Sequence, residues 1–163
     1  MTQTSISNHI AQTYLFQGLD ADQIDRIARR TERVLFQAGD YITIQGEVGG
    51  KAILIVEGEI DCVSGVGTDM NFEGDQVGAM LGEMAMFIDD FEHPATFKAR
   101  KLTKALLIDR REMLQELAND RDLTDHLVRQ VRSRLNGLIA QMRDIEQDLQ
   151  TPVSEIPAQP SPR

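Results

Sequence analysis

The spacing of apolar residues changes along the chain, and each change predicts a different kind of structure. Residues 1–31 have helical spacing, residues 32–110 alternate with a period of two between glycine turns, and residues 111–150 return to helical spacing. Residues 151–163 are rich in proline and poor in large apolar side chains, which predicts a disordered tail. These ranges are the predicted N-terminal helices, β domain, C-terminal helices and tail.

Short strands with glycine turns between them predict the central fold. Residues 52–56 form a continuous apolar run, Glu57 and Gly58 turn the chain back onto residues 59–63, and residues 105–108 form a last strand. Many short strands at regular spacing are typical of an antiparallel barrel or jelly roll. The predicted fold class is therefore mainly β with flanking α: an antiparallel jelly-roll β-barrel with N-terminal helices and a long C-terminal helix.

The charge balance bears on the class of partner. Acidic residues outnumber basic ones by 26 to 17, and the net charge is −9. Nucleic acids and anionic membranes both require a basic face, so neither is expected as a partner. The densest basic group, at Arg129, Arg132 and Arg134, is interpreted as the solvated face of a helix.

The cysteine content and the apolar segments indicate an intracellular protein. Cys62 is the only cysteine, so an intramolecular disulfide cannot form, and its place in an alternating run predicts a buried strand residue. No signal peptide is visible at the start of the chain, and no apolar segment is long enough to span a bilayer. A cytoplasmic location is expected.

Several segments carry a resemblance to a known family when they are taken in order. They are residues 36–42, 45–49, 55–60 and 82–86. With the succession of helices, glycine-marked strands, short helix and long helix, they resemble the cyclic nucleotide-binding domain of the catabolite activator protein family. The resemblance covers residues 15–149, and it implies a ligand site inside the jelly roll.

The resemblance also implies which residues would hold a nucleotide such as cAMP or cGMP. In that family, backbone amides after a glycine, together with an arginine in the sequence Arg-Ala-Ala-Thr, hold the cyclic phosphate, and a glutamate binds the ribose 2′-hydroxyl. The glycine and the glutamate fall on Gly82 and Glu83. A carboxylate also stabilises a helix start without any ligand, so the role of Glu83 stays open. The other positions fall on Met84, Ala85, His93, Ala95 and Thr96.

The chain departs from the family pattern where the phosphate would need its counter-charge. His93 stands at the arginine position, and Pro94 replaces a small residue and removes an amide donor. An arginine on a phosphate makes charge-assisted hydrogen bonds worth about 1.5–3 kcal/mol each, whereas a histidine with a pKa near 6.5 is mostly neutral at pH 7. Asp89, Asp90 and Glu92 add negative charge to the same loop. We favour a site that has drifted away from nucleotide binding over a pH-gated phosphate ligand at His93.

An unbroken 3-4 apolar spacing in the last predicted helix is typical of a coiled coil. Leu123 and Leu127, just before this stripe, are expected to pack against the chain's own domain. The stripe predicts a homodimer through this helix. The flanking charges favour an antiparallel pair whereas the resembled family pairs its helices in parallel, so the geometry stays open. The stripe consists of Val128, Val131, Leu135, Leu138, Met142, Ile145 and Leu149.

These observations favour a non-enzymatic function. The histidines lack metal-ligand spacing, only His93 lies among the strands, and no catalytic or metal-binding residue is predicted. The stretch after residue 149 leaves no room for the winged helix-turn-helix of family transcription factors. The favoured hypothesis is a regulatory or sensor module with a degenerate phosphate-binding cassette, no certain cofactor and a protein partner. The alternative is a functional cAMP or cGMP receptor that signals through protein contacts.

Overall fold

The computed structural model describes residues 2–65 and 77–150, without the side chains at positions 3, 4, 138, 141 and 144–150. The chain divides into two compact units, Met1–Leu127 and Val128–Arg163, and each is described by itself. The predicted tail at 151–163, and the glycine turns at Gly67 and Gly74, lie outside the described residues.

Two short helices open the first unit, as the apolar spacing predicts. Helix α1 spans Gln3–Ala11 and helix α2 spans Ala21–Arg29. A capping box starts α2: the Asp20 carboxylate accepts a hydrogen bond from the Gln23 amide at 2.8 Å, and the Gln23 side chain accepts one from the Asp20 amide at 3.2 Å. This reciprocal pair satisfies amides that the first turn of a helix leaves without partners.

The strands pair into two antiparallel sheets. The four-stranded sheet has the order β1-β7-β3-β5, and the three-stranded sheet has the order β2-β6-β4. The strands of the larger sheet are β1 (Thr31–Phe36), β3 (Lys51–Glu57), β5 (Met80–Leu81) and β7 (Thr103–Asp109). Those of the smaller sheet are β2 (Tyr41–Thr43), β4 (Ile60–Gly65) and β6 (Ala95–Ala99).

The predicted antiparallel arrangement is confirmed, but the prediction of a closed barrel is wrong for the described residues. The two sheets share no strand and no ladder of hydrogen bonds among the residues that the structure describes. Two of the edge strands are too short to extend the pairing, because β2 has three residues and β5 has two. The register also shifts within β2, between Tyr41 and Thr43.

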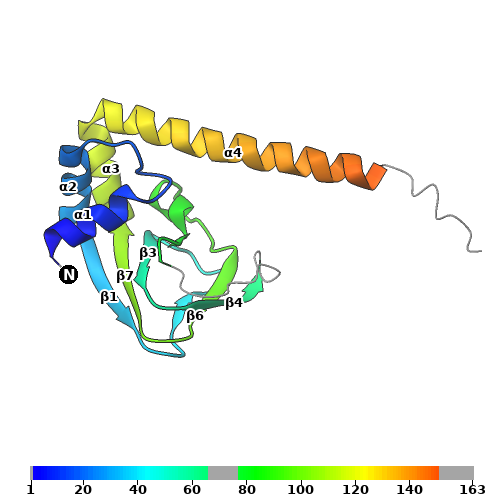
Figure 1. The fold of residues 1–163 in the computed structure, drawn as a ribbon, viewed down its shortest axis with the longest axis horizontal. Coiled ribbons are helices and arrows are strands. Elements are labelled where there is room, and N and C mark those ends of the chain that lie inside the picture. The colour runs from blue at the N-terminus through cyan, green and yellow to red at the C-terminus, as the bar shows by residue number, and fades with distance from the viewer. Residues whose placement is uncertain (1, 66–76, 151–163) are drawn as a thin grey trace, which may run out of the picture. The chain divides into compact units, whose positions relative to one another are not determined.

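The core lies between the two sheets and also behind the larger one. Ile53 and Ile55 of β3 pack with Ile42 and Ile60 of the smaller sheet. Alternation along the strand turns Leu54 to the opposite face, where it is also fully buried. Because both faces of β3 are covered, its five inner residues, 52–56, are all apolar instead of alternating with polar ones. Figure 1 shows α2 and α3 side by side at the end of β1 and β7.

Ion pairs join α2 to α3 (Arg110–Asn119). The buried Glu116 carboxylate lies 3.1 Å from Arg26 Nε and 2.6 Å from Arg30 Nε. Arg26 also pairs with Asp120, whose side chain accepts the Leu123 amide at the start of the next helix. These contacts connect the N-terminal helices to the junction between α3 and α4.

Helix α4 spans Arg121–Gln150 and confirms the predicted long helix. Its first turns belong to the first unit, where Leu123 and Leu127 are buried as predicted. None of the helices in the described ranges combines the length and the apolar character needed to cross a membrane.

Candidate functional site

The predicted phosphate-binding segment forms a left-handed glycine followed by a short 3-10 helix. Gly82 has a φ of 63°, in a region that favours glycine, and η1 follows at Glu83–Met86. The Ala85 amide donates to the Gly82 carbonyl at 2.9 Å, which closes the turn, and the Ala85 side chain is fully buried. The segment therefore turns sharply where β5 ends, and it places Glu83 at the start of η1.

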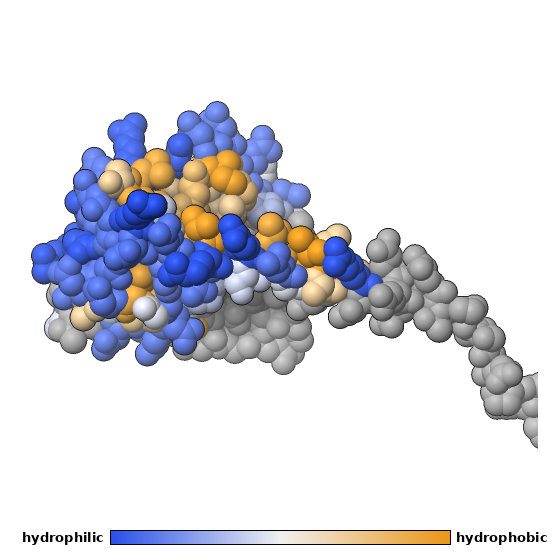
Figure 2. All heavy atoms as spheres, turned by 90° about the horizontal axis from the view of Figure 1, so that it is seen from above, coloured by the Kyte–Doolittle hydropathy of each residue, from blue (hydrophilic) through white to orange (hydrophobic). Residues whose placement is uncertain are grey.

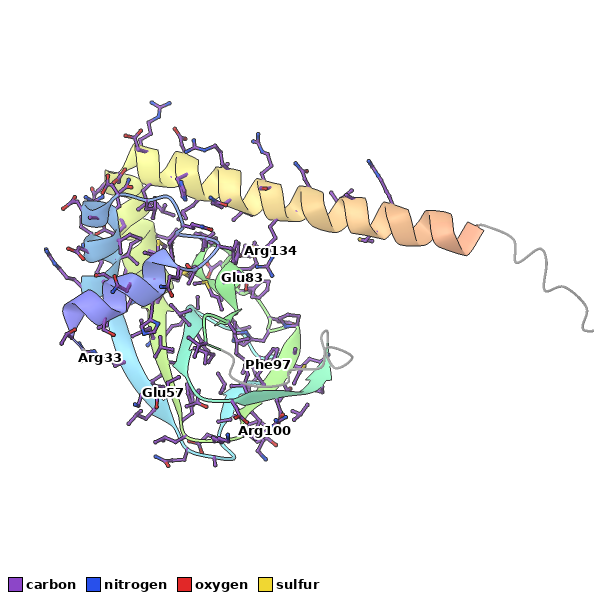
Figure 3. The ribbon with its side chains drawn as sticks, viewed as in Figure 1. Arg33, Glu57, Glu83, Phe97, Arg100 and Arg134 are labelled. Atoms are coloured by element: carbon purple, nitrogen blue, oxygen red, sulfur yellow. The ribbon has the colours of Figure 1, made fainter. Side chains whose placement is uncertain are left out.

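The Glu83 carboxylate has a partner from the N-terminal segment. The Tyr14 hydroxyl, in the connector between α1 and α2, donates a hydrogen bond to Glu83 Oε1 at 3.3 Å. Figure 3 shows Glu83 on the side of η1 that faces this connector. The sequence analysis missed Tyr14, because residues 69 positions apart give no local signal of contact.

A second backbone segment, residues 45–49, runs beside the loop that carries His93. The His93 amide donates to the Glu47 carbonyl at 2.9 Å, and the Gly46 amide donates to the His93 carbonyl at 2.9 Å. The Gly49 amide continues the pairing to the Phe91 carbonyl at 2.8 Å. These main-chain bonds determine where the His93 side chain can lie.

The His93 imidazole lies in a slot between Gly49 and Gly82. A Cβ atom added to Gly49 would be 2.5 Å from His93 Nε2, and one added to Gly82 would be 2.8 Å from His93 Cε1. Side chains on either residue would collide with the ring, so the slot depends on glycine at both positions. Burial lowers the pKa of His93, and the negative charge of Glu47 opposes this shift only in part. Burial therefore favours the neutral form of the ring at the predicted cation position.

The last predicted site residues, Ala95 and Thr96, are buried in β6. The Thr96 hydroxyl accepts hydrogen bonds from the Gln45 amide and from the Ser64 hydroxyl, both at 2.9 Å. The Ala95 carbonyl accepts one from the Thr43 hydroxyl at 3.0 Å. The polar groups of these two residues therefore hold β6 to its neighbouring segments.

The acidic loop after η1 has a cation that the sequence analysis did not assign to it. Arg110, the first residue of α3, pairs with Asp89, and its amide donates to the Gly50 carbonyl at 3.0 Å. Its Nε is buried and has no hydrogen-bond partner in the described part of the chain. Asp90 and Glu92 are exposed, and Asp90 has a positive φ of 52°. Part of the predicted repulsion in this loop is thus offset by Arg110.

The structure brings Gly82–Ala85 and His93 together but leaves Thr96 in the smaller sheet, beside Ser64.

Cys62 is only half-buried, whereas the sequence predicts a buried residue; burial raises the pKa of its thiol. Nowhere in residues 2–65 and 77–150 do three or more His, Cys, Asp or Glu side chains gather as metal ligands would.

The described residues thus form two antiparallel sheets, with a glycine-led turn after β5 and helices before and after the strands. Residues 33–120, more than half of the chain, match the family model "Cyclic nucleotide-binding domain", and the chain belongs to this family.

Known structures and a curated relative agree with this assignment. The N-terminal domain of a transcriptional regulator from Streptomyces coelicolor A3(2) superposes with a TM-score of 0.70 at 22% identity, over 82% of this chain and 94% of that one. The catabolite activator protein of Thermus thermophilus gives a TM-score of 0.63 at 24% identity, over 84% and 62%. Cyclic nucleotide-gated channel beta-1 of Homo sapiens is 22% identical over 114 residues, which are 69% of this chain but only 9% of the channel subunit.

Proposed function

We propose that this chain is a non-enzymatic, cytoplasmic regulatory module whose cyclic nucleotide site has lost its phosphate counter-charge, so that nucleotide binding is weak or absent. The observation that carries the proposal is the position of the His93 ring between Gly49 and Gly82, where the family places an arginine; burial there lowers the pKa of the ring. Pro94 removes a further amide donor from the same corner. A cyclic phosphate would meet a neutral ring there instead of a guanidinium.

Titration calorimetry with cAMP and cGMP tests this proposal. We expect no measurable heat from the native chain at pH 7.5 and millimolar nucleotide. His93→Arg with Pro94→Ala should raise the affinity tenfold to over a hundredfold, because one charge-assisted contact is worth about 1.5–3 kcal/mol. His93→Gln with Pro94→Ala is the matched control: it restores the amide donor without the charge, and it should gain less.

The alternative is a functional receptor for cAMP or cGMP. It is supported by the start of the cassette, where Gly82 has a left-handed conformation and Glu83 follows as the first residue of η1. Native chain that binds either nucleotide with a micromolar dissociation constant would establish this alternative and overturn the proposal. In that case the cation would have to come from another residue.

We also propose that α4 joins two copies of the chain. Four large apolar side chains are exposed among those that the structure describes on this helix, and Leu135 and Met142 are the most exposed of them at 56% and 69%. Figure 2 shows orange apolar residues interspersed with blue polar ones along this helix. The four are Val128, Leu135, Ile139 and Met142, whereas Val131 is half-buried. The side chains at the remaining predicted positions, Leu138, Ile145 and Leu149, are outside the described residues.

Sedimentation of the native chain and of Leu135→Glu with Met142→Glu tests the dimer. The native chain should sediment as a dimer at micromolar concentration, and the double variant as a monomer. Arg129→Glu is the control for a charge change on the same helix. A native monomer at that concentration would rule out the dimer.

In this proposal the module consists of N-terminal helices (residues 1–31), a nucleotide-binding-like β domain (32–110), C-terminal helices (111–150) and a tail (151–163). The module would regulate its target through contacts with a protein partner. The packing of the helices that follow the strands would change with the state of the site.

A further inference from the structure

Two neighbouring cavities of the first unit lie along the larger sheet, and together we call them the strand-end groove. Its inner cavity, of about 380 Å³, is bordered by Phe36, Ile42, Ile53 and His93. Its outer cavity, of about 580 Å³, is bordered by Arg29, Arg30 and Arg111. Lys51, Leu107 and Asp109 border both cavities, so the two cavities adjoin each other at these residues.

The inner end of the groove is apolar. Ile53 and Leu107 are register partners on β3 and β7, so their side chains lie beside each other on the face toward the smaller sheet. Ile42 of β2 packs in the same cluster, in which Phe36 and Leu107 are only half-buried. The groove therefore offers apolar surface that neither sheet covers completely.

The outer end of the groove carries excess positive charge. Its acidic residues are already engaged: Glu32 pairs with Lys51 at 3.0 Å, Glu112 pairs with Arg30, and Asp109 accepts the Arg111 amide at 2.8 Å. Arg29 and Arg111 are exposed, and in the part of the chain that the structure describes no carboxylate lies within 4.0 Å of either guanidinium.

We propose that the strand-end groove binds a small organic anion with an unbranched apolar body, of the class of a free medium-chain carboxylate. The carboxylate lies between the guanidinium groups of Arg29 and Arg111, and the aliphatic chain follows Leu107 toward Ile53. Leu107 and Asp109 are two residues apart on β7 and span about 7 Å, so the alkyl chain of decanoate is long enough to pass from the outer cavity to the inner one. The groove meets the phosphate-binding cassette only at His93, and this inference does not depend on nucleotide binding.

Calorimetry with decanoate, kept below micelle-forming concentrations and titrated into the full chain, tests the proposal. Saturable binding is expected. Octanoate should bind about tenfold more weakly, because each buried methylene contributes about a fourfold factor. Decylammonium should bind at least about tenfold more weakly than decanoate, because its charge meets the arginines.

The variant Arg29→Gln with Arg111→Gln should weaken decanoate binding by at least about tenfold. Its melting temperature should stay near that of the native chain, because both side chains are exposed. Arg33→Gln is the matched control: Arg33 is an exposed residue of β1 that does not border the groove, and it lies on the left of Figure 3. Equal binding of decylammonium, equal binding by the double variant, or binding only to anionic phospholipid vesicles would each overturn the proposal.

Discussion

The contact between Gly49 and the His93 ring yields a quantitative prediction for a double-mutant cycle. A methyl group on Gly49 would stand 2.5 Å from His93 Nε2 and 2.7 Å from His93 Cε1. These distances are about 1 Å shorter than an ordinary contact of 3.5–4.0 Å. Overpacking of this kind typically costs about 1–3 kcal/mol. The Gly49→Ala variant should lose that much stability, which lowers the melting temperature by about 3–12 °C in a domain of this size.

Removing the ring should remove the penalty. In the His93→Ala background, the remaining contact of the new methyl group is Ala85 Cβ at 3.3 Å, which a small shift can relieve. Gly49 does not have a left-handed backbone, so alanine can replace it without backbone strain. Alanine should then add about 0.4–1 kcal/mol of stability, because it lowers the conformational entropy of the unfolded chain. The coupling energy between the two substitutions should therefore be at least about 1 kcal/mol.

Gly50→Ala is the matched control for this cycle, because no atom lies within 4 Å of an added Cβ at that position. Thermal and urea unfolding of the four variants of the cycle and of the control give the required free energies. If Gly49→Ala costs no more than Gly50→Ala, the ring does not lie in the slot. A penalty that persists in the His93→Ala background would show that the ring is not its cause.

Three further predictions concern hydrogen bonds and ionisation. Thr96→Val removes the acceptor of both the Gln45 amide and the Ser64 hydroxyl, so the free energy of unfolding should fall by about 1–3 kcal/mol. Ser64→Ala should lower it less, because the Gln45 amide keeps its bond to Thr96. Burial lowers the pKa of folded His93, so the native chain should lose stability as the pH falls from 7.5 to 5. If the melting temperature of His93→Gln falls by the same amount over this pH range, the prediction is wrong. The Leu123 amide, with Gln23 and Arg26, lowers the pKa of Asp120 below 3.8, so the ionised carboxylate should stabilise the fold above that pH and lose this effect on further acidification. The Asp120→Asn variant should therefore lose less stability over the same acidic range, as followed by circular dichroism.

Local chemistry in the sequence determined most of the elements of this fold. Asp20 and Gln23 mark the start of α2, because a capping box needs only residues close together in the chain. The apolar run at β3 and the heptad spacing of α4 likewise predict a strand and a helix from neighbouring residues alone. The family resemblance rested on segments of this local kind, and the match over residues 33–120 confirms it.

Tertiary structure alone decided how these elements meet. The sheets do not close among the described residues, because closure depends on pairing between distant strands, and two of the edge strands are only two and three residues long. The contacts of Tyr14 with Glu83 and of Arg110 with Asp89 join residues far apart in sequence, so no spacing rule predicts them. The sequence determined that position 93 lacks a permanent charge. Only the packing of Gly49 and Gly82 against the ring determined that the half-buried imidazole has a lowered pKa, because burial depends on neighbours that the chain brings together by folding.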